Sequence, residues 1–206
     1  MRCYGFKGGS GTASRLIQYA GTDYIVGVFV QANFGSRREL VIAGVPLGHE
    51  LGEDYPAVRS TTPEGAGSVI AIVATNAPLL PHQCSALARR VTLGLARTGT
   101  SGSHFSGDLF LALSTANPGA FTPSFEHPRS GVEQRYDELR FIPWACMDPF
   151  YRATVQAVEE AVINALVANQ EMVGIHGHRV PALPRTHVVE ILRGRGVLVE
   201  RVGGTP

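Results

Sequence analysis

The chain has 206 residues, of which 44% are hydrophobic and 17% are charged, and its formal net charge is +1 at pH 7. A chain of this length can bury a substantial core, and the composition argues against an intrinsically disordered protein. The near-neutral charge gives no electrostatic reason to expect nucleic acid or an anionic membrane as a partner, and no apolar run is long enough to cross a bilayer. With 24 glycines and 13 prolines, the chain is expected to contain many tight turns.

The N-terminal third of the chain contains two segments with the character of strands. Gly5–Gly11 is a glycine cluster around Lys7 and is expected to be a loop. The β-branched and aromatic run Asp23–Asn33 predicts a largely buried strand, and Leu40–Val45 is a second candidate. Pro46–Gly67 is rich in glycine, proline and polar residues, which is typical of an exposed linker or a long surface loop.

The middle of the chain alternates between strand and helix patterns. Ser68–Ala74 is the most strand-like run of the sequence. Pro81 suits the first turn of a helix, and apolar residues recur at four-residue spacing through Gln83–Arg97. A glycine- and serine-rich loop is expected over Thr98–Gly107, followed by a further strand over Asp108–Thr115.

The last third of the chain contains the clearest helix. Residues 117–147 are proline-rich and are expected to be irregular. Asp148–Pro149 then begins a helix, with the aspartate as N-cap and an apolar face that continues to Met172. A short helix near Thr186–Leu192 and a strand near Val197–Arg201 are the last elements expected. Because strands and helices alternate irregularly, a layered α/β or α+β fold is favoured over a doubly wound parallel sheet.

Several motifs that could bind a cofactor or a metal are too weak to predict a site. Gly9–Ser14 half-matches a dinucleotide fingerprint but lacks the last glycine and a preceding strand. His176 and His178 have no adjacent acidic or thiol ligand and are interpreted as part of a solvated turn, and His82 with Cys84 has the same weakness. We therefore expect no cofactor and no metal. The cysteines are too few and too scattered for a disulfide framework and are interpreted as small buried hydrophobic residues: Cys3, Cys84 and Cys146.

The junction between Gly67 and Ser68 suggests a specific chemistry. A serine at the first position of a strand, after a glycine-rich linker, is the arrangement that an N-terminal nucleophile requires. If the bond before Ser68 is cut, its hydroxyl gains a neighbouring α-amino group with a pKa of about 7.7 to 8.0, which can act as a base. The hydroxyl itself can make the cut by attacking the carbonyl of Gly67. A plain loop-to-strand junction has the same local sequence, so the spacing leaves both interpretations open.

Short runs over nearly the whole chain resemble one known family and occur in the same order. They are Cys3–Gly9, Gly11–Arg15, Val30–Gly35, Ile42–Pro46, Gly67–Ile70, Ala74–Leu79, Gly94–Gly99, Ser106–Asp108, Ser114–Asn117, Asn164–Leu166 and Gly177–Arg179. Together they look like the L-aminopeptidase/D-esterase (DmpA) family, which also includes β-peptidyl aminopeptidases. This resemblance implies an autoprocessed serine hydrolase without cofactor, with an α+β fold of four αββα layers that resembles the N-terminal-nucleophile hydrolases.

The resemblance also implies a role for individual residues. Ser68 matches the nucleophile that self-cleavage between Gly67 and Ser68 would expose. Asn33 matches the side chain that helps to stabilise the tetrahedral oxyanion. Ser106 and Asp108 match the pair that orients and polarises the nucleophile. The single domain 1–206 would then consist of a partial α segment, 1–67, and a β segment, 68–206.

The expected substrates are small peptides, amides or esters with a free amine, cleaved through an acyl-enzyme on Ser68. A homo-oligomer of αβ units and a cytoplasmic location are expected, without nucleic acid or membrane partners. Because the family's chains are longer and the block beginning at Cys3 normally lies inside the α part, we expect this chain to lack the N-terminal part of that segment. The fold is then incomplete on that side.

Two alternatives stay open at this point. One is an inactive truncated remnant or a structural half that a partner completes, since missing strands would leave a sheet edge and an apolar face exposed. The other is an acyltransferase similar to the ornithine acetyltransferases. Those enzymes use threonine as the nucleophile, so the serine at position 68 argues against this second alternative.

Overall fold

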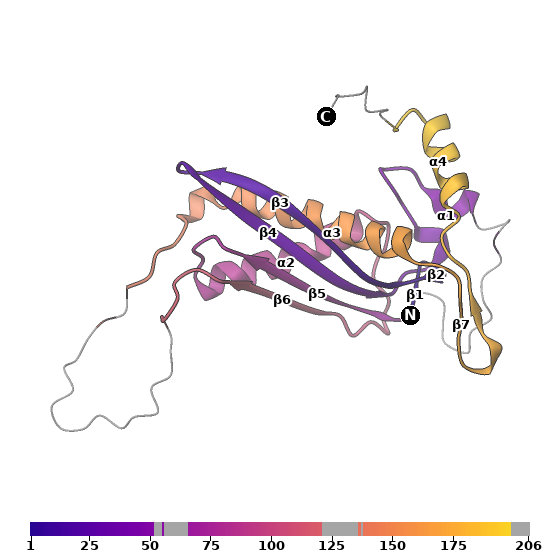
Figure 1. Cartoon of the computed structure of the whole chain (residues 1–206), viewed down its shortest axis with the longest axis horizontal. Helices are drawn as coiled ribbons and strands as arrows, with labels where there is room; N and C mark the ends of the chain where they lie inside the picture. The colour runs from indigo at the N-terminus through magenta and orange to yellow at the C-terminus, as the bar shows by residue number, and fades with distance from the viewer. Residues whose placement is uncertain (52–54, 56–65, 121–135, 137, 199–206) are drawn as a thin grey trace.

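A computed structural model describes residues 1–51, 55, 66–120, 136 and 138–198. Its centre is a four-stranded sheet, shown in Figure 1, in the order β3–β4–β5–β6. Neighbouring strands run antiparallel from β3 to β5, whereas β5 and β6 run parallel. These strands are β3 (Gly9–Tyr19), β4 (Thr22–Asn33), β5 (Ser68–Thr75) and β6 (Leu109–Ser114).

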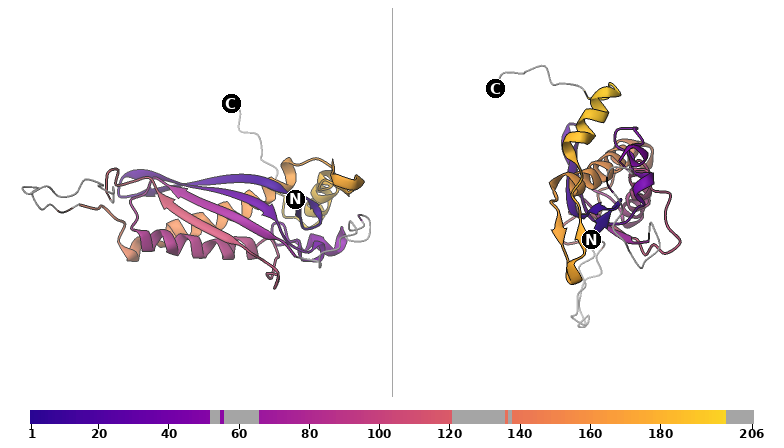
Figure 2. Two further views of the ribbon diagram at one scale, coloured as in Figure 1. Left: turned by 90° about the horizontal axis from the view of Figure 1, so that it is seen from below. Right: turned by 90° about the vertical axis from the view of Figure 1, so that its right-hand side faces the viewer.

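Two long helices, α2 (Pro81–Ala96) and α3 (Asp148–Ala168), cover one face of this sheet (Figure 2). The remaining elements are short, and most of them lie at the end of the molecule where the N-terminus is found (Figures 1 and 2). They are β1 (Arg2–Cys3), β2 (Phe6–Lys7), α1 (Leu47–Glu50), β7 (Met172–Val173), β8 (Arg179–Val180), α4 (Arg185–Gly194) and the 3-10 turns η1 (Arg37–Glu39), η2 (Trp144–Cys146) and η3 (Ile175–Gly177).

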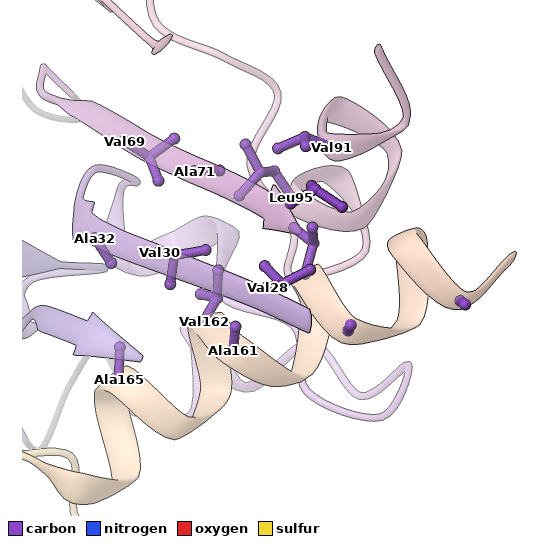
Figure 3. Packing of buried hydrophobic residues seen from close by; sticks show 14 of the residues in the cluster. Val28, Val30, Ala32, Val69, Ala71, Val91, Leu95, Ala161, Val162 and Ala165 are labelled. Carbon is purple, nitrogen blue, oxygen red and sulfur yellow. The ribbon is translucent and has the colours of Figure 1, made fainter. Parts of the chain in front are cut away.

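The core lies between the sheet and the two helices. Alternate residues of each strand point toward the helices, so the period of two in β4 and β5 places one set of apolar side chains inside. Figure 3 shows this packing, with Val28, Val30, Ala32, Val69 and Ala71 of the sheet facing Val91 and Leu95 of α2 and Ala161, Val162 and Ala165 of α3; all of these residues are buried.

Glycine lets α3 approach the sheet closely. A Cβ atom on Gly11 would lie 2.0 Å from the carbonyl oxygen of Ala161, so no larger residue fits between β3 and the helix. Gly94 has the same function between the helices, because a Cβ atom there would lie 2.6 Å from Cβ of Val158. The glycines of this fold therefore serve packing as well as turns.

The opposite face of the sheet is apolar and open among the described residues. Leu109 and Leu111 of β6 are 64% and 55% exposed, and Ile70 of β5 is 44% exposed. Leu16, Ile25 and Leu113 continue this surface across β3, β4 and β6, and we call the six residues the open face. A sheet normally buries one such face against a second layer. The described residues thus form one helix layer on one sheet layer.

Several predictions made from the sequence are wrong. The glycine cluster Gly5–Gly11 is not a loop, because it forms β2 and the start of β3. Leu40–Val45 is not a strand: Ala43 and Gly44 have φ angles of 52° and 76°, and the tight turn leaves a single bridge between Ile42 and Val45. The helix expected to reach Met172 ends at Ala168, and Met147, not Asp148, is its N-cap.

The other expected elements agree with the structure where it describes them. The strands at Asp23–Asn33, Ser68–Ala74 and Asp108–Thr115 and the helices at Gln83–Arg97 and Thr186–Leu192 are confirmed to within a few residues. The linker expected at Pro46–Gly67 is an exception, because its described start forms α1 with Leu47 and Leu51 buried and is not an exposed loop. The rest of this linker, up to residue 65, lies mostly outside the described residues, as does about half of the segment 117–147. So does most of the strand expected at Val197–Arg201, whose first two residues are not in a strand. Within the described ranges, no helix is both long and apolar enough to cross a membrane.

Candidate active site

The pairing of β4 with β5 places Asn33 and Ser68 at facing positions, at the end of β4 and the beginning of β5. Ala32 and Val69, the neighbours of this pair in the two strands, are buried against the helices. Because side chains alternate along a strand, Asn33 and Ser68 lie on the opposite face of the sheet, which the described residues leave open. The hydrophobic pattern that builds the core therefore also brings these two polar side chains together.

The loop before β6 contributes the next group of residues. The Ser106 hydroxyl donates a hydrogen bond to Asp108 Oδ1 at 2.5 Å. The backbone N–H of Val69 donates to the same oxygen at 2.9 Å. Gly107 lies between Ser106 and Asp108 in the chain, and its backbone N–H donates to Ser68 Oγ at 2.8 Å. Asp108 thus ties the loop to the first residues of β5, directly beside Ser68.

The side-chain amide of Asn33 has a defined orientation. The backbone N–H of Arg2 donates to Asn33 Oδ1 at 2.9 Å. Since a backbone N–H can only donate, Oδ1 must face Arg2. The Nδ2 group, which carries the two donor hydrogens, then points elsewhere.

A buried arginine holds the segment that supplies this contact. Arg37 is only 5% exposed, and its guanidinium donates to the carbonyl of Tyr4 at 3.1 Å and to that of Gly5 at 2.6 Å. Burial lowers the pKa of Arg37 to about 10, so the side chain stays charged at neutral pH. The turn between β1 and β2 is thereby fixed against η1, which keeps Arg2 next to Asn33.

Gly67 precedes the nucleophile candidate at a point of very close backbone contact. A Cβ atom on Gly67 would lie 2.0 Å from the carbonyl oxygen of Asn33 and 3.2 Å from Cα of Phe34. Only glycine fits between the end of β4 and the start of β5. The bond between Gly67 and Ser68 is consequently held beside Asn33.

The structure brings together all four residues that the sequence singles out, Asn33, Ser68, Ser106 and Asp108. Sequence reasoning missed the backbone groups of Gly107, Val69 and Arg2, because a sequence does not reveal where a main-chain N–H points. The only indication of Gly107 in the sequence was its position between Ser106 and Asp108, both of which the sequence analysis singles out.

The residues considered for metal binding lie elsewhere. His176 and His178 are exposed at the turn between β7 and β8, as expected for a solvated turn. Among the described residues, no group of three or more His, Cys, Asp or Glu side chains could hold a metal ion. Cys3 and Cys84 are buried and Cys146 is half-buried, all with free thiols.

A hydroxyl next to a backbone carbonyl, with a carboxylate and N–H donors nearby, provides groups that acyl transfer uses. The hydroxyl can attack the carbonyl carbon. Of the backbone N–H groups, that of Gly107 contacts Ser68 Oγ, whereas those of Val69 and Arg2 bond to Asp108 and Asn33. The carboxylate of Asp108 orders the loop that carries one of those donors.

Comparison with known proteins gives consistent matches. Residues 1–180 match the model of Peptidase family S58. The β-peptidyl aminopeptidase BapA of Sphingosinicella microcystinivorans is 40% identical over 203 residues, covering 94% of this chain and 49% of that protein. The chain therefore spans about half the length of the curated relatives it matches.

Two solved structures extend this similarity to the fold. One is the L-aminopeptidase D-Ala-esterase/amidase of Ochrobactrum anthropi, described as a prototype for the serine aminopeptidases and a variant of the Ntn hydrolase fold, with a TM-score of 0.80 and 38% identity over 97% of this chain and 51% of that one. The other is a β-aminopeptidase of a Burkholderia species, with a TM-score of 0.79 and 37% identity over 100% of this chain and 52% of that one. The expected α+β fold of N-terminal-nucleophile type is confirmed, and the chain covers about half of it.

Proposed function

Because the chain belongs to Peptidase family S58, we propose that it is the self-cleaving, nucleophile-bearing part of a serine aminopeptidase. The resemblance expected from the sequence is thereby confirmed at the level of the family. The observation that carries the proposal is the hydroxyl of Ser68, held by the Gly107 N–H at the first position of β5 and opposite Asn33. The assigned roles are Ser68 as nucleophile, Asn33 as oxyanion donor, and Ser106 with Asp108 as the pair that orients the nucleophile.

The first reaction is the cut between Gly67 and Ser68. Ser68 Oγ loses its proton and forms a bond to the carbonyl carbon of Gly67, and the carbonyl oxygen becomes a tetrahedral oxyanion. The bond from that carbon to the Ser68 nitrogen then breaks, and the nitrogen takes up the proton that Oγ has lost. The resulting ester is hydrolysed by water, which leaves a carboxylate on Gly67 and a free hydroxyl and α-amine on Ser68.

The second reaction uses the same atoms on a substrate. The free α-amine of Ser68, with an ordinary pKa of about 7.7 to 8.0, can accept the proton of its own hydroxyl near neutral pH. The hydroxyl attacks an amide or ester carbonyl and forms an acyl-enzyme, and the leaving amine or alcohol takes up the proton. Water then releases the acyl group. We assign peptides, amides and esters with a free N-terminal amine as substrates.

The segments follow from the cut. One domain, 1–206, would consist of an α segment, 1–67, and a β segment, 68–206, which share one hydrophobic core. Since the relatives are about twice as long, we propose that further family sequence supplies the second sheet layer on the open face. A homo-oligomer of αβ units and a cytoplasmic location complete the proposal; the three free thiols favour a reducing compartment.

A second candidate function is a structural half without activity of its own, completed by a partner. The observation that favours it is the open face, where Leu109 is 64% exposed. An apolar surface of this kind marks an interface in many proteins. The two candidates differ in whether the isolated chain cuts itself.

Intact-mass spectrometry of the purified, folded chain tests the proposal. We expect two fragments that divide between Gly67 and Ser68, and a single uncut chain after Ser68→Ala. A matched control is Ser103→Ala, in the loop before β6, which should leave the cut unchanged. A folded wild-type chain that stays uncut contradicts the proposal and favours the structural half.

Hydrolysis of aminoacyl p-nitroanilides tests the substrate class. We expect activity on L-, D- or β-aminoacyl derivatives and little on their N-acetylated forms, because the proposed substrates have a free amine. Equal rates on free and acetylated amines would contradict the aminopeptidase assignment while leaving the nucleophile in place.

A further inference from the structure

The backbone N–H of Gly107 is the donor closest to the chemistry, because it bonds directly to the reacting oxygen of Ser68. We propose that this N–H is a further catalytic group, which stabilises negative charge on Ser68 Oγ during the self-cut and during turnover. The inference rests on the proposed function, since it assumes that Ser68 is the nucleophile. It assigns to Gly107 a role separate from that of Asn33, which would act on the carbonyl oxygen.

The surroundings of Gly107 hold its N–H in place. Both neighbours are fixed: Ser106 bonds through its hydroxyl to Asp108 Oδ1, and that oxygen also accepts the N–H of Val69. One residue later, Leu109 enters β6 and pairs with Ile70 of β5. The peptide group between Ser106 and Gly107 is therefore preorganised and needs no rearrangement when charge develops.

The hydrogen bond has the polarity that the reaction requires. A backbone N–H only donates, so Ser68 Oγ is the acceptor in this contact. Hydrogen bonds to a charged oxygen are stronger than those to a neutral one, so the contact strengthens as the hydroxyl loses its proton. The same charge returns to Oγ when the acyl group leaves, so the donor acts on both the formation and the breakdown of the ester.

Glycine at this position also leaves room for the nucleophile. A Cβ atom on Gly107 would lie 3.3 Å from Ser68 Oγ, which is tighter than ordinary van der Waals contact. An alanine would keep the N–H but press against the hydroxyl. A proline would remove the N–H altogether.

The first test compares the rates of self-cleavage of two proline variants. Gly107→Pro removes the donor to Ser68. His104→Pro is the matched control, because His104 follows Ser103 in a turn closed by a 3.0 Å bond from the Ser106 N–H to the Ser103 carbonyl. Proline is favoured at that second turn position. We expect Gly107→Pro to cut about 10- to 100-fold more slowly than His104→Pro, the loss of one hydrogen bond to a charged group.

The second test does not depend on whether Gly107→Pro folds. It uses the Asn33→Ala variant, in which cutting is slowed and mass spectrometry verifies that the chain is uncut. The NMR chemical shift of the Gly107 amide proton and its rate of exchange with solvent are compared in this variant with and without the additional substitution Ser68→Ala. Labelling glycine with ¹⁵N and serine with ¹³C selects glycines that follow serine. Gly102, whose N–H donates to Thr100 Oγ1 at 3.2 Å in the same loop, is the internal reference.

We expect Ser68→Ala to move the Gly107 amide proton upfield and to speed its exchange with solvent, while Gly102 stays unchanged. An unchanged Gly107 signal, or a folded Gly107→Pro variant that cuts as fast as His104→Pro, overturns this inference alone. A folded wild-type chain that never cuts overturns the proposed function and this inference together.

Discussion

Asn33 and Ser68 are direct partners across the antiparallel pairing of β4 and β5. Their relative position is therefore set by the register of two strands that are buried on their other face. A slip of one residue in either strand would turn the polar side chain of that strand into the core, which the apolar pattern of the strands prevents. The spacing between the proposed nucleophile and the proposed oxyanion donor is in this way a consequence of core packing.

The first prediction concerns the amide of Asn33. Asn33→Ala should slow self-cleavage about 100- to 1,000-fold, the usual effect of losing one oxyanion donor. Asn33→Asp is the sharper variant, because a carboxylate still accepts the N–H of Arg2 but has no hydrogen to donate. Time courses by intact mass should show both variants to be slow, with the melting temperature of Asn33→Asp near that of the wild type. Fast cutting by Asn33→Asp would contradict a donor role.

The second prediction concerns the close approach at Gly67. Gly67→Ala should destabilise the fold by about 1–3 kcal/mol, since its Cβ would overlap the Asn33 carbonyl. It should also slow the cut by displacing the carbonyl that Ser68 attacks. Gly27→Ala, in β4 of the same sheet, is the control, because its Cβ would lie at an ordinary 3.8 Å from Ala74. The free energies of unfolding are measured by urea unfolding of both variants in the uncut Ser68→Ala background. Equal losses of stability in Gly67→Ala and Gly27→Ala would refute the argument.

The third prediction concerns the carboxylate of Asp108. Asp108→Ala removes the acceptor for both Ser106 and Val69 and should release the loop that holds the Gly107 N–H. We expect slower cutting than with Asp108→Asn, which retains one acceptor oxygen. Asp23→Asn, at the far end of β4, should cut at the wild-type rate. If Asp108→Ala cuts as fast as Asp23→Asn, the carboxylate does not order the site.

The fourth prediction concerns alkaline pH. Burial raises the pKa of the fully buried Cys3 thiol from its usual value of 9.0. The folded chain therefore keeps a proton that the unfolded chain loses, so stability is complete below pH 9.0 and falls as the pH rises above it. The loss from one such group is about 1.4 kcal/mol per pH unit. Urea unfolding across this pH range should show a smaller loss of unfolding free energy in Cys3→Ala than in the wild type. A pH dependence of stability that the substitution leaves unchanged would contradict the assignment.

The fifth prediction concerns the open face. The isolated chain should bind 1-anilinonaphthalene-8-sulfonate and self-associate, because Leu109, Leu111 and Ile70 are exposed on one contiguous sheet surface. Replacing Leu109 and Leu111 together by serine should reduce both effects without lowering the melting temperature. Dye fluorescence and sedimentation velocity measure them. Leu93→Ser, on the exposed side of α2, is the control and should change neither.

Where side-chain pattern decides a structure, the sequence was sufficient. The alternating run of β4, the apolar run of β5 and the four-residue spacing of α2 all predict the elements that form. The strand β3 was missed because Gly9 and Gly11 read as a loop, although glycine is required there for α3 to approach. A close approach between distant segments is a tertiary property that no local window contains.

The candidate site divides in the same way. The side chains of Ser68, Asn33, Ser106 and Asp108 could be matched through family resemblance, and the structure places them together. The donors that orient them come from the main chain of Arg2, Val69 and Gly107, so residue type carries no signal for them. Gly107 is conspicuous only once β6 is aligned beside β5.

The core that continues across the proposed cut has a consequence for folding. Residues on both sides of the Gly67–Ser68 bond fill the same interior, Val30 from β4 and Val69 from β5 among them, and α3 lies on β3 and β4. If the proposed cut occurs, the two segments become separate molecules, and refolding changes from a first-order into a second-order process that depends on concentration. On this proposal the chain folds while it is uncut, and after denaturation the cleaved form recovers only when its two segments meet again.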